Sequence, residues 1–450
     1  MAFFKFLTVF LLQLSLSLQS PILRRGIPVP PADDPFYTPP SGWESSSPGA
    51  ILASRPVPNP IAAVFLKENV DGAYQLLYRT TDSLGNPSYT VTSVLIPYNA
   101  DYSKVVQYHI AEDAAYSECA PSYAIQYLSD PTEAISQIEM AAITVVLNTG
   151  VVVAVPDYEG PNSAFGAGII AGQAALDSVR AVLQSNSVTG VSSDAKVTLM
   201  GYSGGSIPVG HAAQVESTYA PDLNDAILGY ALGGVVANLT ATGEYINGGV
   251  FSGFIPDIIV GLSAEYPQLV PFVQEQVSAE WYATIEKYKT QCVAADLLTA
   301  PFINIYDIAA DGEGIFTNSI VGPIMDSLVM GSNPATVPVK PIYMYHSESD
   351  EIVPFGPVST LYKTWCEQGA VVSFHEDILS EHATELVFGL PGAVKWQYDI
   401  LDGDAPPTTC SVTQSINNAF NLADLEFIGA PAAALLLDIL ADWPVGSVTI

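Results

Sequence analysis

The chain has 450 residues, with 14 basic and 46 acidic side chains and a formal net charge of −32. This charge excludes a nucleic-acid binder, which needs clustered Lys and Arg, and a protein that docks on anionic membranes. Because 49% of the residues are hydrophobic and only 13% are charged, we expect a large buried core, in one α/β domain with insertions or in two to three domains.

Residues 1–20 have the pattern of a secretory signal peptide. Lys5 precedes an apolar run from Phe6 to Leu12, and small residues follow as far as Ser20. The run is shorter than the roughly 20 residues that span a bilayer. We therefore expect a secreted, extracellular protein without a transmembrane segment. The pair Arg24 and Arg25 is either a processing site or two solvated charges.

Four cysteines remain in the secreted part of the chain, where oxidising conditions favour disulfides. Cys119, Cys292, Cys366 and Cys410 allow three pairings into two bridges. A metal site is the alternative, but no pair has the spacing of zinc ligands, so no metal is expected. Asn238 starts an Asn-Leu-Thr sequon and is a candidate glycosylation site.

The middle of the chain alternates predicted strands with predicted helices. Residues 21–60, rich in Pro and Ser, predict an extended arm that is partly held against the body. Residues 61–239 and 321–421 then form the predicted core, a doubly wound and mostly parallel α/β sheet. Its predicted strands are 89–97, 104–110, 150–156, 196–200, 225–232, 341–345 and 371–375; its predicted helices are 166–183, 208–215, 358–368 and 392–401.

Two segments interrupt this alternation. Residues 240–320 mix Gly-rich turns with helical stretches between two core strands, which predicts an inserted helical cap or lid. Residues 422–450 contain an apolar stretch at 429–437. This stretch is either a helix packed on the core or a mobile apolar flap over a site.

Residues 201–205, Gly-Tyr-Ser-Gly-Gly, match the G-x-S-x-G pattern of a nucleophile elbow. A sharp turn from strand to helix leaves no room for side chains at Gly201 and Gly205, and Tyr202 is part of the same elbow. The predicted strand before the motif and the helix after it are the context that the pattern requires. We therefore predict that Ser203 is a nucleophile rather than part of a plain Gly-rich turn.

A serine nucleophile needs a base and an acid that orients it, which follow in the order Ser, acid, His. His382 comes after the last predicted strand, in a loop ahead of a short helix, where the base is expected. The other four histidines are expected to be core or surface residues. Asp350 follows the preceding strand and is the predicted acid; Glu348 and Glu351 in the same loop are the alternatives, or ordinary loop acids.

The oxyanion of an acyl-transfer reaction needs two hydrogen-bond donors. The backbone N–H of Gly204, directly after the nucleophile, is the first candidate. The second is expected in the loop after strand 104–110, where we predict Asp113, acting through its N–H and, at low pH, its carboxyl proton. The alternative role for Asp113 is to cap a helix.

Together, four motifs of this chain resemble the fungal secretory lipases, over roughly residues 40–440: 156–160, 201–206, 349–354 and 381–385. The resemblance implies an α/β-hydrolase fold, with a helical cap between the sixth and seventh core strands and a C-terminal flap over an acyl tunnel. It also implies a triad, two oxyanion donors and two disulfides: Ser203, Asp350 and His382; Asp113 and Gly204; Cys119–Cys292 and Cys366–Cys410.

The sequence therefore predicts a secreted triacylglycerol lipase, a serine hydrolase that forms an acyl-enzyme without a metal or organic cofactor. Its expected partner is a lipid or ester at an oil–water interface, and we expect a monomer. A short-chain carboxylesterase or acetylesterase on the same fold is the alternative, because fold does not determine substrate. Less favoured are a secreted peptidase and a catalytically dead, hydrolase-like binding protein.

Overall fold

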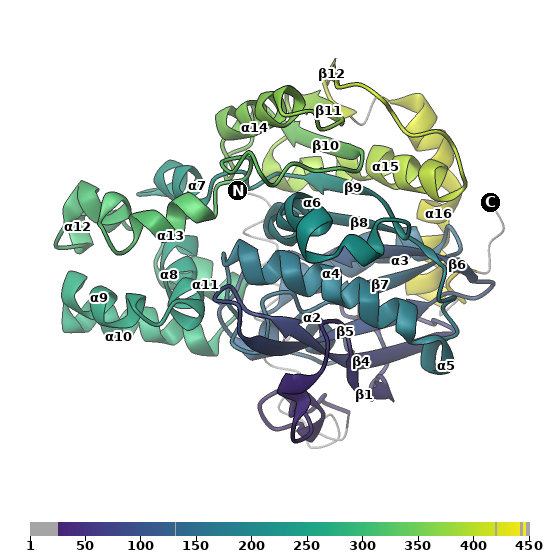
Figure 1. Cartoon of the computed structure of the whole chain (residues 1–450), viewed down its shortest axis with the longest axis horizontal. Coiled ribbons are helices and arrows are strands. Elements are labelled where there is room, and N and C mark those ends of the chain that lie inside the picture. Colours follow the sequence, from purple (N-terminus) through teal and green to yellow (C-terminus); the bar gives the residue numbers. More distant parts are fainter. Residues whose placement is uncertain (1–25, 131, 419–420, 442–443, 447–450) are drawn as a thin grey trace.

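The computed structural model describes residues 26–130, 132–418, 421–441 and 444–446. The predicted signal peptide and the Arg24–Arg25 pair lie outside these residues. A ten-stranded sheet forms the centre, in the order β1-β4-β5-β7-β6-β8-β9-β10-β11-β12 (Figure 1). The strands are β1 Ile51–Pro56, β4 Gly72–Thr81, β5 Pro87–Ile96, β6 Asp101–His109, β7 Val151–Pro156, β8 Lys196–Tyr202, β9 Ile227–Gly233, β10 Ile342–Ser347, β11 Val372–Asp377 and β12 Ser411–Ser415. A separate hairpin pairs β2 Ala62–Ala63 with β3 Leu66–Lys67.

Most of the sheet is parallel. The strands from β7 to β12 run in one direction, and β1, β4 and β5 form an antiparallel edge. Every residue of β7 is buried, as its unbroken apolar run predicted for a strand covered on both faces. The predicted α/β architecture with a mostly parallel sheet is therefore confirmed.

Helices cover both faces of the sheet (Figure 1). One face packs on α4 Gly168–Gln184, α6 Ser206–Tyr219 and α14 Phe355–Glu367, whose apolar residues share a core with the strands. The other face packs on α3 Ala134–Leu147 and α15 His382–Leu401. Two short helices, α2 Pro121–Ala124 and α5 Asn186–Thr189, lie in connections. The parallel strands are thus covered by helices on both faces of the sheet.

The cap lies between β9 and β10 and projects to the left in Figure 1. Its helices are α7 Leu239–Ile246, α8 Phe254–Glu265, α9 Leu269–Gln276, α10 Ala279–Ile285, α11 Val293–Thr299, α12 Ile305–Ile308 and α13 Gly322–Ser327. Most of them contribute to one apolar cluster, which also contains core residues such as Phe165, Ile207 and Val353. Ile285 of α10 belongs to a second cluster. The cap is thus packed on the core through apolar side chains.

Both ends of the core differ from the sequence-based expectation. Within the predicted arm, residues 51–56 form the edge strand β1, which pairs with β4. The arm is fastened there by Arg55, which lies 2.7 Å from Asp34 and stacks over the ring of Phe36. Residues 422–441 form α16 (Leu422–Ala441), which packs against α15 and α3.

Two disulfides join distant segments. Cys119, in the loop after β6, is bonded to Cys292 at the start of α11, so the cap is tied to the core. Cys366 in α14 is bonded to Cys410, directly before β12. This is the pairing that the family resemblance implied.

Candidate active site

The nucleophile elbow forms where β8 ends and the turn η5 (Ser203–Gly205) begins. Ser203 has a φ of +53°, a strained conformation that non-glycine residues adopt mainly at functional sites. A Cβ atom on Gly201 would lie 2.1 Å from the carbonyl oxygen of Gly205, and one on Gly205 would lie 2.0 Å from that of His109. Both positions therefore require glycine, as the motif predicted.

The structure brings the predicted nucleophile, base and acid together in one hydrogen-bonded line. The Nε2 atom of His382 lies 2.8 Å from the hydroxyl oxygen of Ser203, and its Nδ1 lies 2.6 Å from Oδ2 of Asp350. The other carboxylate oxygen of Asp350 accepts the N–H groups of Ile352 and Val353. The acid is thus held from both sides, and the imidazole bridges it to the serine.

The local surroundings of His382 differ from the prediction. His382 is the first residue of α15, a 20-residue helix, rather than a loop residue ahead of a short one. Glu381 and Thr384 form a capping box that starts the helix, while Pro391 inside it hides its continuity in the sequence. Strand β11 is also not the last strand, since β12 follows α15.

The surroundings of Asp350 and His382 favour the charged form of each side chain. Burial disfavours the charged form of Asp350, but His382 and His346 together hold the pKa of its carboxyl below the ordinary value. Burial also disfavours a charged His382, yet Asp350, Glu351 and Asp113 hold the pKa of its imidazole above the ordinary value. The pair therefore favours a carboxylate that stabilises an imidazolium.

Asp113 lies directly beside the elbow. It has a φ of +48° in the loop after β6, and a Cβ atom on Gly204 would lie 1.7 Å from its Oδ1. Burial raises the pKa of this carboxyl to about 7, so its neutral form carries a proton at acidic pH. The alternative helix-capping role is wrong, because the next helical turn starts at Ser117 and its N-cap residue is Tyr116.

Two groups that the sequence analysis left unassigned hold the backbone of His382. Glu351 accepts its N–H at 2.8 Å, and the hydroxyl of Tyr202 donates to its carbonyl oxygen at 2.7 Å. Glu351 was considered only as an alternative acid, and Tyr202 only as part of the elbow. The signal for Glu351 was its place directly after Asp350, in the loop that faces the base.

The loop that carries Asp113 is also anchored by acids that the sequence did not single out. Glu139 in α3 accepts the N–H of Ala111 at 2.8 Å, and Asp257 in α8 accepts that of Ala115 at 2.9 Å. Their only sequence signal is that each is an acid on a largely apolar stretch of its helix. A buried acid in such a place needs a partner, and here the partner is the loop backbone.

The remaining histidines lie outside the hydrogen-bonded line; three of them are buried and His375 is half-buried. His109 is in β6, His211 in α6 and His375 in β11, and burial lowers the pKa of each to about 4. His346 accepts the N–H of Val235 at 2.9 Å, and its Nε2 lies 3.7 Å from Oδ2 of Asp350. It therefore supports the acid loop rather than replacing His382.

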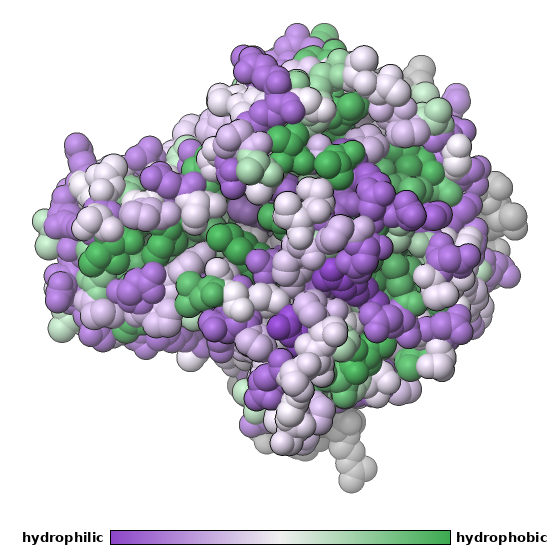
Figure 2. All heavy atoms as spheres, in the orientation of Figure 1, coloured by the Kyte–Doolittle hydropathy of each residue, from purple (hydrophilic) through white to green (hydrophobic). Residues whose placement is uncertain are grey.

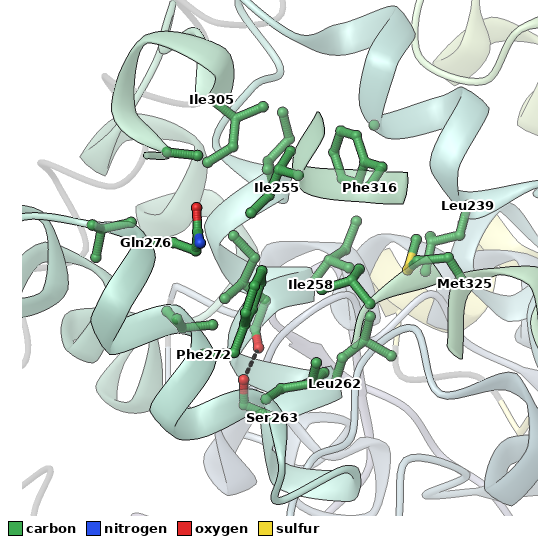
Figure 3. Close-up of a pocket in the computed structure, with 18 residues that line it drawn as sticks. Leu239, Ile255, Ile258, Leu262, Ser263, Phe272, Gln276, Ile305, Phe316 and Met325 are labelled. Atoms are coloured by element: carbon green, nitrogen blue, oxygen red, sulfur yellow. Dashed lines mark hydrogen bonds between the residues drawn. The ribbon is translucent and has the colours of Figure 1, made fainter. Parts of the chain in front are cut away.

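An apolar cavity extends from Ser203 into the cap. Asp113, Ser203 and Gly204 line its inner end. A second apolar cavity lies among the cap helices, and Leu239 and Ile258 line both. Figure 3 shows Ile258, Leu262 and Phe316 around this second cavity, and Figure 2 shows apolar residues gathered on the cap at the left.

The C-terminal segment does not contribute to these cavities within the described residues. Helix α16 packs on α3 and α15, and the carbonyl oxygen of Pro431 accepts a hydrogen bond from the side chain of Asn148. The described part of residues 422–450 therefore agrees with the alternative of a helix packed on the core. The flap over an acyl tunnel stays a prediction.

Two further groups have clear local structures. Cys119, Glu133 and Cys292 are close enough to resemble a metal site, but both sulfur atoms belong to a disulfide, so they are not thiolate ligands. Asn238 is the N-cap of α7, where its Oδ1 accepts the N–H of Ala241 at 3.0 Å. Its glycosylation stays a prediction.

Among the helices of the described residues, none is long and apolar enough to cross a bilayer.

Three comparisons place the chain among known proteins. Lipase 5 of Candida albicans is 38% identical over 429 residues, which is 94% of this chain and 91% of that protein. The crystal structure of Candida antarctica lipase A in its closed state matches with a TM-score of 0.81 and 29% identity, over 94% of this chain and 98% of that one. The rice cell wall degrading esterase LipA of Xanthomonas oryzae, 16% identical, matches with a TM-score of 0.60 over 80% of this chain and 100% of that one; it shares the fold alone.

These likenesses confirm the expected α/β-hydrolase core. The family model described as "Secretory lipase" matches residues 125–408, a range that contains Ser203, Asp350 and His382. The chain belongs to the secretory lipase family.

Proposed function

We propose that this protein is a secreted triacylglycerol lipase that hydrolyses fatty acyl esters through an acyl-enzyme on Ser203. The observation that carries the proposal is the hydrogen-bonded line from Asp350 through His382 to Ser203 at the inner end of an apolar cavity. The two disulfides and the family support secretion.

In the proposed reaction, Nε2 of His382 takes the proton of the Ser203 hydroxyl as its oxygen attacks the ester carbonyl. The imidazolium then gives this proton to the departing alcohol, which leaves an acyl group on the serine oxygen. A water molecule repeats the sequence, with His382 taking its proton, and releases the fatty acid. Asp350 keeps the Nδ1 proton in place and stabilises the imidazolium throughout.

The tetrahedral oxyanion forms beside the backbone N–H groups of Gly204 and Asp113. The Asp113 carboxyl supports the same position, because its Oδ1 has no hydrogen-bond partner among the described residues and lies against the elbow. In its neutral form it is able to donate a proton to the oxyanion, which a carboxylate cannot do.

The two neighbouring cavities would supply a path for an acyl chain. Their shared residues, Leu239 and Ile258, are apolar and come from cap helices. An extended hydrocarbon chain is stabilised there by about 0.8 kcal/mol for each CH₂ group removed from water. Long acyl chains therefore fit this site better than acetyl groups.

The first experiment measures hydrolysis of p-nitrophenyl esters from two to eighteen carbons and of emulsified triolein. Activity on long chains and on triolein supports a lipase, whereas activity confined to short chains favours the carboxylesterase alternative. Ser203→Ala should abolish turnover while leaving the unfolding temperature within about one degree. Hydrolysis that survives in this variant contradicts the acyl-enzyme mechanism.

A serine-reactive phosphonate tests the same proposal without a substrate. We expect one adduct on the intact chain and none on Ser203→Ala, as measured by mass spectrometry. A folded wild-type protein that forms no adduct would favour the catalytically dead binding protein instead.

A further inference from the structure

Glu351 directly follows the proposed triad acid and lies at the start of the helix that carries the proposed base. Its Oε2 accepts the backbone N–H of His382 at 2.8 Å. Because His382 is the first residue of α15, this N–H has no acceptor within the helix. Glu351 supplies that acceptor, and its negative charge also suits the positive end of the helix dipole.

The loop after β10 therefore contacts His382 at two points. Asp350 holds the imidazole through Nδ1, and Glu351 holds the main chain through the N–H. On the opposite side, Tyr202 donates to the carbonyl oxygen of His382. The same loop thus fixes both the orientation of the imidazole and the position of the first residue of α15.

We propose that Glu351 is a positioning residue for the ester hydrolysis, which fixes the main chain of His382 and stabilises the imidazolium formed when Ser203 loses its proton. This inference rests on the function proposed above. It assigns Glu351 no contact with substrate and no proton transfer of its own.

The charge on Glu351 acts together with other groups. Burial opposes the charged imidazolium, and Asp350, Glu351 and Asp113 in turn raise the pKa of His382. The titratable groups that face His382 from the neighbouring elements are Asp350 and Glu351 of the loop after β10, His346 of β10, Asp113 of the loop after β6, Glu139 of α3 and Tyr202 of β8. Since Asp350 stays in place, removing one charge should lower this pKa without abolishing the base.

Two variants separate the two roles. Glu351→Gln keeps an oxygen that is able to accept the N–H of His382 but removes the charge, and Glu351→Ala removes both. Glu348→Gln and Glu348→Ala are matched controls, because Glu348 is an exposed acid of the same loop whose carboxylate accepts a hydrogen bond from Gln414 instead. The experiment measures kcat and kcat/KM for p-nitrophenyl butyrate from pH 4 to 9, with the unfolding temperature of each variant.

In Glu351→Gln, the acid limb of the kcat/KM profile should move to lower pH by about 0.5 to 1 unit, because an imidazole with less negative charge nearby loses its proton more readily. The plateau should fall only slightly. Glu351→Ala should show the same shift and also a fall in plateau kcat of about 10-fold or more, because the base is less well placed. The Glu348 variants should match the wild type.

Two outcomes overturn the inference: an acid limb that stays in place in folded Glu351→Gln, or a shift of equal size in Glu348→Gln. Both leave the proposed function intact, since the wild type still hydrolyses the ester. A wild-type protein without ester hydrolysis contradicts the proposed function itself.

Discussion

Asp113 combines a backbone conformation that is rare outside glycine with a carboxyl group that has no hydrogen-bond partner among the described residues. Such strain is retained when the surrounding structure over-determines it. Here two anchors do so, the contacts of Ala111 with Glu139 and of Ala115 with Asp257. The loop therefore holds one polar group beside the elbow, where negative charge would develop in the proposed reaction.

This arrangement makes a pH prediction for Asp113. With a pKa of about 7, the carboxyl is a neutral donor below pH 7 and an anion that repels the oxyanion above it. Activity of the wild type should therefore decline through pH 7 to 8. Asp113→Asn donates at every pH and tolerates positive φ, so its kcat/KM should stay level up to pH 9.

The measurement is kcat/KM on a soluble p-nitrophenyl ester, with samples held at pH 9 and then assayed at pH 6 as a control for unfolding. A variant that declines through pH 7 to 8 in the same way as the wild type contradicts this role of the carboxyl.

Among the elements, helix α8 lies at the proposed junction of the acyl path, because its Ile258 lines both the cavity at Ser203 and the cavity among the cap helices. Ile258→Trp should block this junction. Hydrolysis of esters longer than about eight carbons should fall by about 10-fold or more, while that of acetyl and butyryl esters changes little. An equal loss for short and long chains would mean that the helix was distorted and the path was not tested.

The two disulfides should contribute differently. The bridge Cys119–Cys292 closes a sequence separation of 173 residues and joins the Asp113 loop to the cap, whereas Cys366–Cys410 closes a separation of 44. Chain entropy predicts that replacing the first pair by serine costs about 1 kcal/mol more than replacing the second. Denaturant unfolding measures this difference. Only the first replacement should also lower kcat, and equal kcat values would contradict the link between the bridge and the loop.

Sequence alone predicted the elements whose patterns are local. An apolar run predicted the strand before Ser203, and the lack of space in the turn explained the glycines on either side of it. The elbow was therefore predicted at its observed position. The order Ser, acid, His then selected Asp350 and His382. Strands β1, β4 and β12 were missed. For β1 and β12 the reason is that edge strands with exposed residues lack a strong apolar pattern. The packing of α16 on α3 and α15 is a long-range contact that no local pattern encodes.

At the scale of the whole molecule, many acids are buried without a cation. Burial raises the pKa of several such carboxyl groups, which thus keep their protons in the folded state: Glu112, Asp113, Glu133, Glu139, Asp157, Glu159, Asp257, Asp296 and Glu385. The unfolded chain loses these protons near pH 4. Each group therefore lowers the free energy of unfolding as pH rises, by up to about 1.4 kcal/mol per pH unit, until its folded pKa is passed.

The buried histidines have the opposite effect between pH 4 and 6.5, since their folded pKa values near 4 lie below the unfolded value of about 6.5. Above pH 6.5 these histidines no longer contribute, and the carboxyl groups act in the same direction as His382, whose folded pKa is raised, so stability should fall clearly from pH 6.5 to 8. Thermal unfolding followed by circular dichroism measures it. The oxygens of Glu159 have no hydrogen-bond partner among the described residues, so Glu159→Gln should make stability fall less steeply with pH. Glu348→Gln, at an exposed position, should leave the pH dependence unchanged. A stability that rises from pH 6.5 to 8 contradicts this explanation.

The double attachment of the Asp113 loop to the cap has a consequence for protein engineering. The cap is an insertion between β9 and β10. An engineer could therefore regard it as a module to be replaced by the cap of a relative, in order to change the preferred length of the acyl chain. Yet Cys292 and Asp257, which hold the loop, belong to that module. A chimera that replaces the cap also removes these two cap contacts of the proposed oxyanion donor's loop and leaves only the Glu139 anchor. We expect it to retain catalysis only if these two positions are transplanted back.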